Sequence, residues 1–131
     1  MTVFLFVGEA PSLKAQKKSW DWEDGHLAAR QLFDALQACG VNPHQQWFTN
    51  ISEGKVAQVL CTKALRVGWV IVGLGRKVQG ELRRFGIPYL AMVHPAARGS
   101  IRKKERYAAH VREVLGPYLV PQISEKTTEH A

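Results

Sequence analysis

Four short segments of this chain hold side chains or backbone groups that could do chemistry, and each lies at the end of an apolar run. They are Gly8-Glu9-Ala10-Pro11, Phe48-Thr49-Asn50, Gly73-Leu74-Gly75 and His94-Pro95-Ala96-Ala97. An imidazole can donate a hydrogen bond to a group that gains negative charge, and an asparagine amide can donate and accept at once. A glycine-rich turn before a helix can present backbone N–H groups to a phosphate. The four segments therefore define the candidate functional residues.

Each segment, taken singly, also has an ordinary structural interpretation. The first can be only a tight turn, and Asn50 can cap the turn that follows it. His94 precedes a proline, which favours extended backbone, and a lone histidine is more often structural than catalytic. Gly73-Leu74-Gly75 can simply allow a helix to pack closely on a sheet, and it lacks the GxGxxG and Walker spacings of nucleotide sites. The arrangement of the segments must decide between these interpretations.

Apolar runs alternate along the chain with stretches of helical periodicity. The runs predict strands at residues 3–7, 46–51, 68–74 and 88–93, because they are short, apolar and bounded by turn residues. Apolar positions at helical spacing predict helices across residues 29–36, 56–64, 78–85 and 107–115. Residues 9–25 are expected to form a polar loop, and the last helix is expected to end at Gly116-Pro117.

Strand–helix alternation repeated four times predicts an α/β fold, a single-domain α/β/α sandwich with a central four-stranded parallel sheet. The predicted domain covers residues 1–121, followed by a polar, flexible tail at 122–131. In such sheets ligands bind beyond the carboxyl ends of the strands. All four segments fall at those ends, so we expect one site along that edge.

Length and composition set the class of protein. The chain has 131 residues, of which 46% are hydrophobic, and this suits one globular domain and excludes disorder throughout. No apolar run approaches the ~20 residues of a membrane-spanning helix, and the first residues lack the basic region of a signal peptide. Cys39 and Cys61 offer neither a disulfide framework nor a CxxC metal pair. We expect a soluble, cytoplasmic protein that contacts no membrane.

The charge is concentrated in one part of the chain. Residues 66–112 hold 11 basic and two acidic side chains, whereas the remaining residues hold seven basic and nine acidic ones. A one-sided basic region is typical of proteins that bind polyanions, although net charge also favours solubility. The pattern favours a nucleic-acid partner over a merely solvated surface.

Together and in this order, the four segments resemble the uracil-DNA glycosylase superfamily. The likeness is greatest to its iron–sulfur-type (family 4) branch, whose first motif is GEAPG and whose last is HPA or HPS. It covers roughly residues 3–115. The resemblance implies excision of uracil from single- or double-stranded DNA, as in base excision repair, with no obligate protein partner evident.

The resemblance also implies roles for individual residues. His94 and Glu9 are the expected catalytic residues, with the imidazole donating to the uracil oxygen that gains charge. Asn50 is expected to read uracil against cytosine, beside the backbone of Gly8 and Ala10. Trp22, or next to it Trp20, is expected to stack on the flipped base. The expected DNA-binding residues are Gly75, Arg76, Lys77, Arg98, Gly99, Ser100, Arg102 and Lys103.

This sequence departs from the family pattern in three respects. The chain is shorter than most members and lacks the four cysteines of the iron–sulfur cluster, so we expect no metal or other cofactor. Lysines at 14, 17 and 18 stand where acidic residues usually position the attacking water, and the nearest acids are Asp21, Glu23 and Asp24. Two alternatives therefore stand beside an active glycosylase. One is a uracil- or DNA-binding relative without turnover, and the other is an unrelated nucleotide-binding α/β protein.

Overall fold

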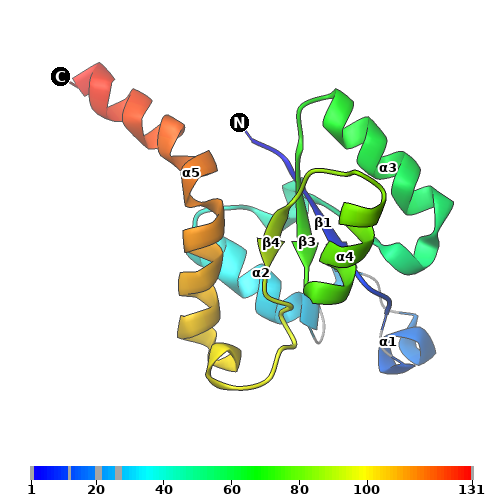
Figure 1. Ribbon diagram of the computed structural model, residues 1–131. Coiled ribbons are helices and arrows are strands. Elements are labelled where there is room, and N and C mark those ends of the chain that lie inside the picture. The colour runs from blue at the N-terminus through cyan, green and yellow to red at the C-terminus, as the bar shows by residue number, and fades with distance from the viewer. Residues whose placement is uncertain (1, 12, 20–21, 26–27, 131) are drawn as a thin grey trace.

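Four parallel strands form the centre of the molecule in a computed structural model, which describes residues 2–11, 13–19, 22–25 and 28–130 (Figure 1). The strands lie in the order β2-β1-β3-β4, and all three pairings between neighbours are parallel. The predicted α/β class and four-stranded sheet are thus confirmed. The strands are β1 (Phe4–Gly8), β2 (Trp47–Asn50), β3 (Val70–Leu74) and β4 (Leu90–Met92).

Helices cover both faces of the sheet, as parallel strands with helical crossovers require (Figure 1). Alternate residues of β1 point to opposite faces. Phe4 and Phe6 pack toward one pair of helices, whereas Leu5 and Val7 pack toward the other. The first pair is α2 (Ala28–Ala38) and α5 (Lys104–His130), and the second is α3 (Lys55–Arg66) and α4 (Arg76–Arg84).

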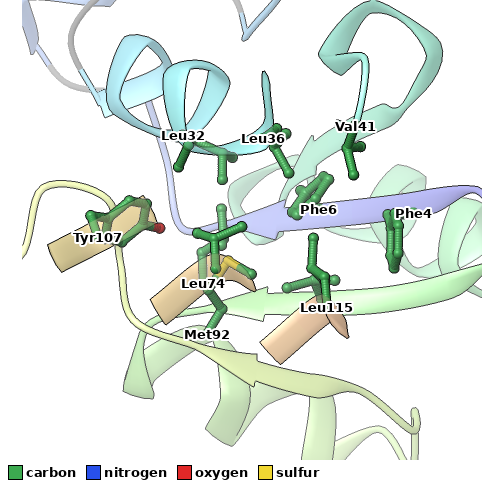
Figure 2. Packing of buried hydrophobic residues seen from close by; sticks show 12 residues of the cluster. Phe4, Phe6, Leu32, Leu36, Val41, Leu74, Met92, Tyr107 and Leu115 are labelled. Atoms are coloured by element: carbon green, nitrogen blue, oxygen red, sulfur yellow. The ribbon is translucent and has the colours of Figure 1, made fainter. Parts of the chain in front are cut away.

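The larger core lies between the sheet and the helices α2 and α5. Figure 2 shows Leu32 and Leu36 of α2 on one side of Phe6, with Leu115 of α5 close to the same strand. All four side chains are fully buried. Burial of one such side chain stabilises a fold by about 1.5–3 kcal/mol, so this core holds α5 firmly against β4 and β1.

Residues 9–25 are not wholly the polar loop that the sequence predicts. They include a short helix, α1 (Leu13–Lys18), and a 3₁₀ turn, η1 (Trp22–Asp24). Lys, Ala, Gln and Leu are all good helix formers, which accounts for the turn and a half of helix in a polar segment. Further 3₁₀ turns are η2 (Pro43–Gln45), η3 (Ile51–Glu53) and η4 (Ser100–Arg102).

The expected end of the last helix at Gly116-Pro117 is wrong, because α5 continues to His130. The helix changes direction partway along, and its red end lies away from the sheet (Figure 1). Proline bends a helix because it lacks an N–H and crowds the carbonyl of the preceding turn. Tyr118 and Leu119 pack against the core directly after Pro117, which stabilises the turn that follows the proline. A flexible tail at 122–131 stays a prediction.

The length of α5 raises the question of a membrane span. Within the described part of the chain, no helix combines the length and the apolar character needed to cross a bilayer.

Candidate functional site

The carboxyl ends of all four strands meet at one edge of the sheet, where the sequence predicts the site. Gly8 and Asn50 are paired at the ends of β1 and β2. Gly75 follows β3, and its N–H donates to the carbonyl of Met92 at the end of β4 over 2.9 Å. Gln79 of α4 ties the same two strand ends together, because its side-chain amide donates to Gly73 and Met92 carbonyls at 3.0 and 3.1 Å.

Gly8 lies against the two side chains expected to contact a base. A methyl group at position 8 would come within 2.6 Å of Asn50 Oδ1 and 2.8 Å of the Trp22 ring. Carbon atoms do not approach this closely, so a side chain here would displace both neighbours. Trp22 Nε1 donates to Asn50 Oδ1 over 3.3 Å. The structure therefore brings Gly8, Trp22 and Asn50 together.

Trp22 belongs to a ladder of aromatic rings. Its ring stacks on Phe48 at 5.4 Å between centroids, and Phe48 stacks in turn on Phe6 at 5.4 Å. Phe33 of α2 packs obliquely on the same Phe48 ring. Offset stacking adds about 0.5–1.5 kcal/mol per pair beyond simple burial. The indole is thus anchored to the core through Phe48, a residue of the second segment for which the sequence predicted no role of its own.

Glu53 fixes the backbone that carries Asn50. One carboxylate oxygen, Oε2, accepts from the Asn50 N–H and from the Thr49 hydroxyl, each at 2.8 Å. Thr49 is itself almost completely buried. Charge-assisted bonds of this kind are short and strong, so the start of the turn after β2 is well defined. The spacing of Asn50 and Glu53 is that of a capping box, and this signal was present in the sequence.

Glu9 and Lys77 form an ion pair across the ends of β1 and β3. The Nζ and Oε1 atoms are 2.7 Å apart, and both side chains are well exposed. The hydrogen bond and the charge of Lys77 lower the pKa of Glu9, and Glu9 in turn raises the pKa of Lys77. Glu9 is therefore ionised near neutral pH, and Lys77 is already partnered rather than a free cation.

His94 begins a tight turn that fixes its ring. Its Nδ1 accepts from the Ala96 N–H at 3.0 Å, and its carbonyl accepts from the Ala97 N–H at 2.9 Å. Because Nδ1 is an acceptor, the proton of the neutral ring lies on Nε2, which is then a donor. Burial lowers the pKa of His94, although the charge of Glu9 opposes this effect. The site thus offers a neutral imidazole N–H donor near neutral pH.

Gly75 lies against this histidine. Its φ of 92° is in the left-handed region, which glycine adopts readily, and a methyl group here would touch His94 Cβ at 3.4 Å. Arg76, exposed, and Lys77 then open α4. Since the Gly75 N–H is bonded to Met92, it is not available to a phosphate, which weakens the nucleotide-cradle interpretation of Gly73-Leu74-Gly75.

The loop after His94 carries a group of exposed polar residues. They are Arg98, Gly99, Ser100, Arg102 and Lys103. The Arg102 carbonyl accepts from Gln31 of α2 at 2.9 Å, which fixes the 3₁₀ turn to the helix beside it. By contrast, Arg83 bonds the hydroxyl of Tyr89 at 2.9 Å, just before β4 begins. Arg83 therefore lies toward the amino edge of the sheet, opposite His94.

A groove of about 400 Å³ lies between α3 and α4, and the sequence analysis did not predict it. Among the predicted residues it is lined by Glu9, Ala10 and Lys77, but not by Asn50, Trp22 or His94. The predicted site residues are thus divided. Gly8, Asn50 and Trp22 form one cluster, and Glu9 and Lys77 link the groove to the strand edge.

Neither cysteine is placed for shared metal binding. Cys39 packs against the core under α2 and α5, whereas Cys61 is buried in the core under α3 and α4, on the opposite face of the sheet. Burial raises the pKa of both thiols, that of Cys61 to about 11. Across the described ranges, no group of three or more His, Cys, Asp or Glu side chains is arranged to hold a metal ion.

Trp20 and Asp21, two of the predicted candidates, lie outside the described residues. The side chain of Glu23 also lies outside the part that the structure describes.

Comparisons with known proteins add no relationship to this geometry. No protein-family model matches the chain, and no curated protein matches it. The likeness to the uracil-DNA glycosylase superfamily therefore depends on the four sequence segments.

Proposed function

We propose that the protein is a uracil-DNA glycosylase, which flips uracil out of DNA and hydrolyses its N-glycosidic bond. The observation that carries this proposal is the carboxyl edge of the parallel sheet, where the close-packed Gly8 ends β1, the Asn50 amide ends β2 and the His94 imidazole lies just after β4. Breaking the bond between uracil N1 and the sugar C1′ leaves the electron pair on uracil. Water then adds to C1′, and the proton that the water loses neutralises the uracil anion. Negative charge on the uracil and positive charge on the sugar must both be stabilised.

His94 is suited to the charge on uracil. Its neutral Nε2–H can donate to a uracil oxygen as that oxygen becomes an oxyanion, an effect worth ~3–4 kcal/mol per donor at comparable sites. A rigid donor matters here, because a group already in place needs no reorganisation when the charge develops. The two hydrogen bonds that close the turn from His94 to Ala97 provide that rigidity.

Asn50 is suited to reading the base. Its Oδ1 holds the Trp22 N–H and has a second lone pair, and its Nδ2 can donate to uracil O4. Cytosine has an amino group where uracil has O4. The Asn50 Nδ2 group and that amino group are both donors, so they cannot form a hydrogen bond with each other. Flipping the base into such a site costs a few kcal/mol, which stacking and hydrogen bonds must offset.

The ionised carboxylate of Glu9 is suited to the positive sugar. Lys77 keeps it deprotonated, and a fixed negative charge stabilises an oxocarbenium-like transition state. The same ion pair favours a second candidate function, binding of uracil or DNA without turnover. A carboxylate held by an ammonium is a poor base for the attacking water.

A cleavage assay and a gel shift together separate these functions. The protein is incubated with uracil-containing single- and double-stranded oligonucleotides and with thymine controls, and abasic sites are then cleaved with alkali. We expect strand cleavage at uracil only. Binding of the uracil strands in a gel shift, with no cleavage, would support the second function. If the protein neither binds nor cleaves, the unrelated nucleotide-binding interpretation remains.

A further inference from the structure

Both polar groups of the Val93 peptide backbone are held by side chains of α5. The Val93 N–H donates to His110 Nε2 over 2.9 Å, and Tyr107 donates its hydroxyl to the Val93 carbonyl over 2.8 Å. Tyr107 and His110 are three residues apart in the helix, so they lie on the same face. Tyr107 is almost completely buried.

The position of β4 explains why Val93 needs such partners. β4 is an edge strand, paired with β3 alone. The Met92 carbonyl accepts from Gly75 on the β3 side, and the polar groups of consecutive residues in a strand point to opposite sides. Val93 therefore points its N–H and carbonyl away from the sheet, on the side where the described residues form no further strand. The two side chains of α5 take the place of the missing strand.

Val93 directly precedes His94, and this position gives the arrangement its significance. The Val93 carbonyl and the His94 nitrogen belong to one rigid peptide unit. Tyr107 therefore orients the peptide unit between Val93 and His94, where the His94 turn begins. His110 holds the N–H of Val93, the residue before His94. We propose that His110 and Tyr107 are positioning residues for His94. The effect of this positioning on the rate of excision rests on the function proposed above.

This arrangement depends on the neutral form of His110. Nε2 can accept from Val93 only when it is unprotonated, so the imidazolium ion would place two donors face to face. Burial lowers the pKa of His110, and the charge of Glu113 on the same helix partly opposes this. Near neutral pH the imidazole is therefore available as an acceptor.

The neighbouring elements also bring ionisable groups close to this part of α5. β4 carries no ionisable side chain. Asp34 of α2 lies 3.9 Å from Lys104. The thiol of Cys39, the residue that follows α2, contacts the Ala108 carbonyl. Arg112 donates to the Ala38 carbonyl at 2.9 Å, and η4 contributes the exposed Arg102. Glu113 is the charged group that acts on His110, and it raises the pKa of the imidazole.

Amide hydrogen exchange of the ¹⁵N-labelled full chain tests the proposal without depending on activity. His110→Gln keeps an acceptor near Nε2 but cannot be protonated, His110→Ala removes the acceptor, and Tyr107→Phe removes only the hydroxyl. His44→Gln, at an exposed histidine of η2, is the matched control. We expect the exchange rate of the Val93 N–H to rise about tenfold in His110→Ala, the change expected when one net hydrogen bond is lost. We expect no rise in His110→Gln or the control.

The His94 ring and the pH profile complete the test. The His94 ring resonances should move in His110→Ala and Tyr107→Phe but not in His110→Gln. In the parent, protection of Val93 should fall as His110 is protonated, and in His110→Gln it should stay constant with pH. For an active glycosylase, His110→Ala and Tyr107→Phe should lower kcat and leave KM unchanged, and His110→Gln should restore kcat.

The outcomes are distinguishable. Unchanged Val93 exchange in His110→Ala, or unmoved His94 resonances in both disrupting variants, would overturn the positioning role. If the parent excises no uracil but the exchange and resonance results are as expected, the positioning role stands and the proposed function fails.

Discussion

Trp22 donates its indole N–H to Asn50 Oδ1, and both side chains lie against the place that a Cβ atom of residue 8 would fill. This contact joins the loop after β1 to the end of β2, and it requires a residue without a side chain between them. The close approach gives the glycine of the first segment a steric role in addition to that of a turn residue.

Gly8→Ala should therefore destabilise the protein by ~1–3 kcal/mol, the usual cost of forcing a methyl group into a filled space. The new Cβ would lie 2.6 Å from Asn50 Oδ1 and 2.8 Å from the Trp22 ring. Urea denaturation measures the free energy of unfolding. Gly80→Ala is the matched control, because its Cβ meets open space within α4, and it should stabilise by ~0.5–1 kcal/mol. Equal effects of the two changes would contradict the close approach.

His94→Ala should slow uracil excision by at least ~100-fold, the loss expected for one oxyanion donor. DNA binding should stay nearly intact, because the charge on uracil exists only as the bond breaks. Single-turnover rates measure the chemical step directly. Circular dichroism of the variant controls for unfolding, and equal rates in variant and parent would remove His94 from catalysis.

Asn50→Asp should weaken both uracil excision and the discrimination against cytosine. A carboxylate at this position can still accept from Trp22, which protects the local fold, but it cannot donate to uracil O4. An unmet polar partner costs ~1–3 kcal/mol. Excision rates on matched uracil and cytosine oligonucleotides provide the measurement, and an unchanged uracil rate would exclude Asn50 from base reading.

DNA affinity should depend more on the cations beside His94 than on those at the opposite edge. Each phosphate contact contributes a slope of about −0.9 to log K against log salt on duplex DNA. Replacing Arg102 and Lys103 by Ala should lower that slope by up to about two units. The double change of Arg83 and Arg84 is the control, because both lie at the end of α4, where Arg83 contacts Tyr89 toward the other edge of the sheet. Equal shifts would show that binding is diffuse.

Acid should destabilise the fold through His94 and His110. Burial lowers both folded pKa values below the ordinary 6.5, so the unfolded chain binds more protons as the pH falls through that value. The stabilisation is complete above about pH 6.5 and is lost progressively below it, until the pH passes the folded pKa values. Urea denaturation of the parent and of His94→Gln/His110→Gln at several pH values checks this. The double variant should lose less stability on acidification.

The sequence predicted the sheet and the edge at which the four segments meet, because both depend on short-range signals. Apolar runs that end in glycine or asparagine identify the strands, and parallel strands necessarily bring their carboxyl ends to one edge. Gly8 and Asn50 are neighbours for this reason, although more than 40 residues separate them in the chain.

Contacts made by side chains across elements could not be predicted in this way. The pairing of Lys77 with Glu9 depends on how α4 leaves β3, and the stacking of Trp22 on Phe48 depends on the path of a polar segment. His110 gave a weak signal, since it lies at helical spacing beside Tyr107 and Val111 on the face that packs on the core. The course of α5 beyond Pro117 was not predicted, because Gly116-Pro117 is a strong local signal for the end of a helix. In the structure, Tyr118 and Leu119 pack against the core and the helix continues.

The hydrogen bonds between Val93 and α5 also affect how copies of this protein associate with one another. An edge strand with free N–H and carbonyl groups is a template on which another chain can add a strand, and this is a common route to aggregation. β4 is only three residues long, and the next outward-facing peptide groups are already occupied by His110 and Tyr107. The sheet therefore has little on this side to which a further strand could attach, and α5 protects the β4 edge of the sheet against edge-to-edge association.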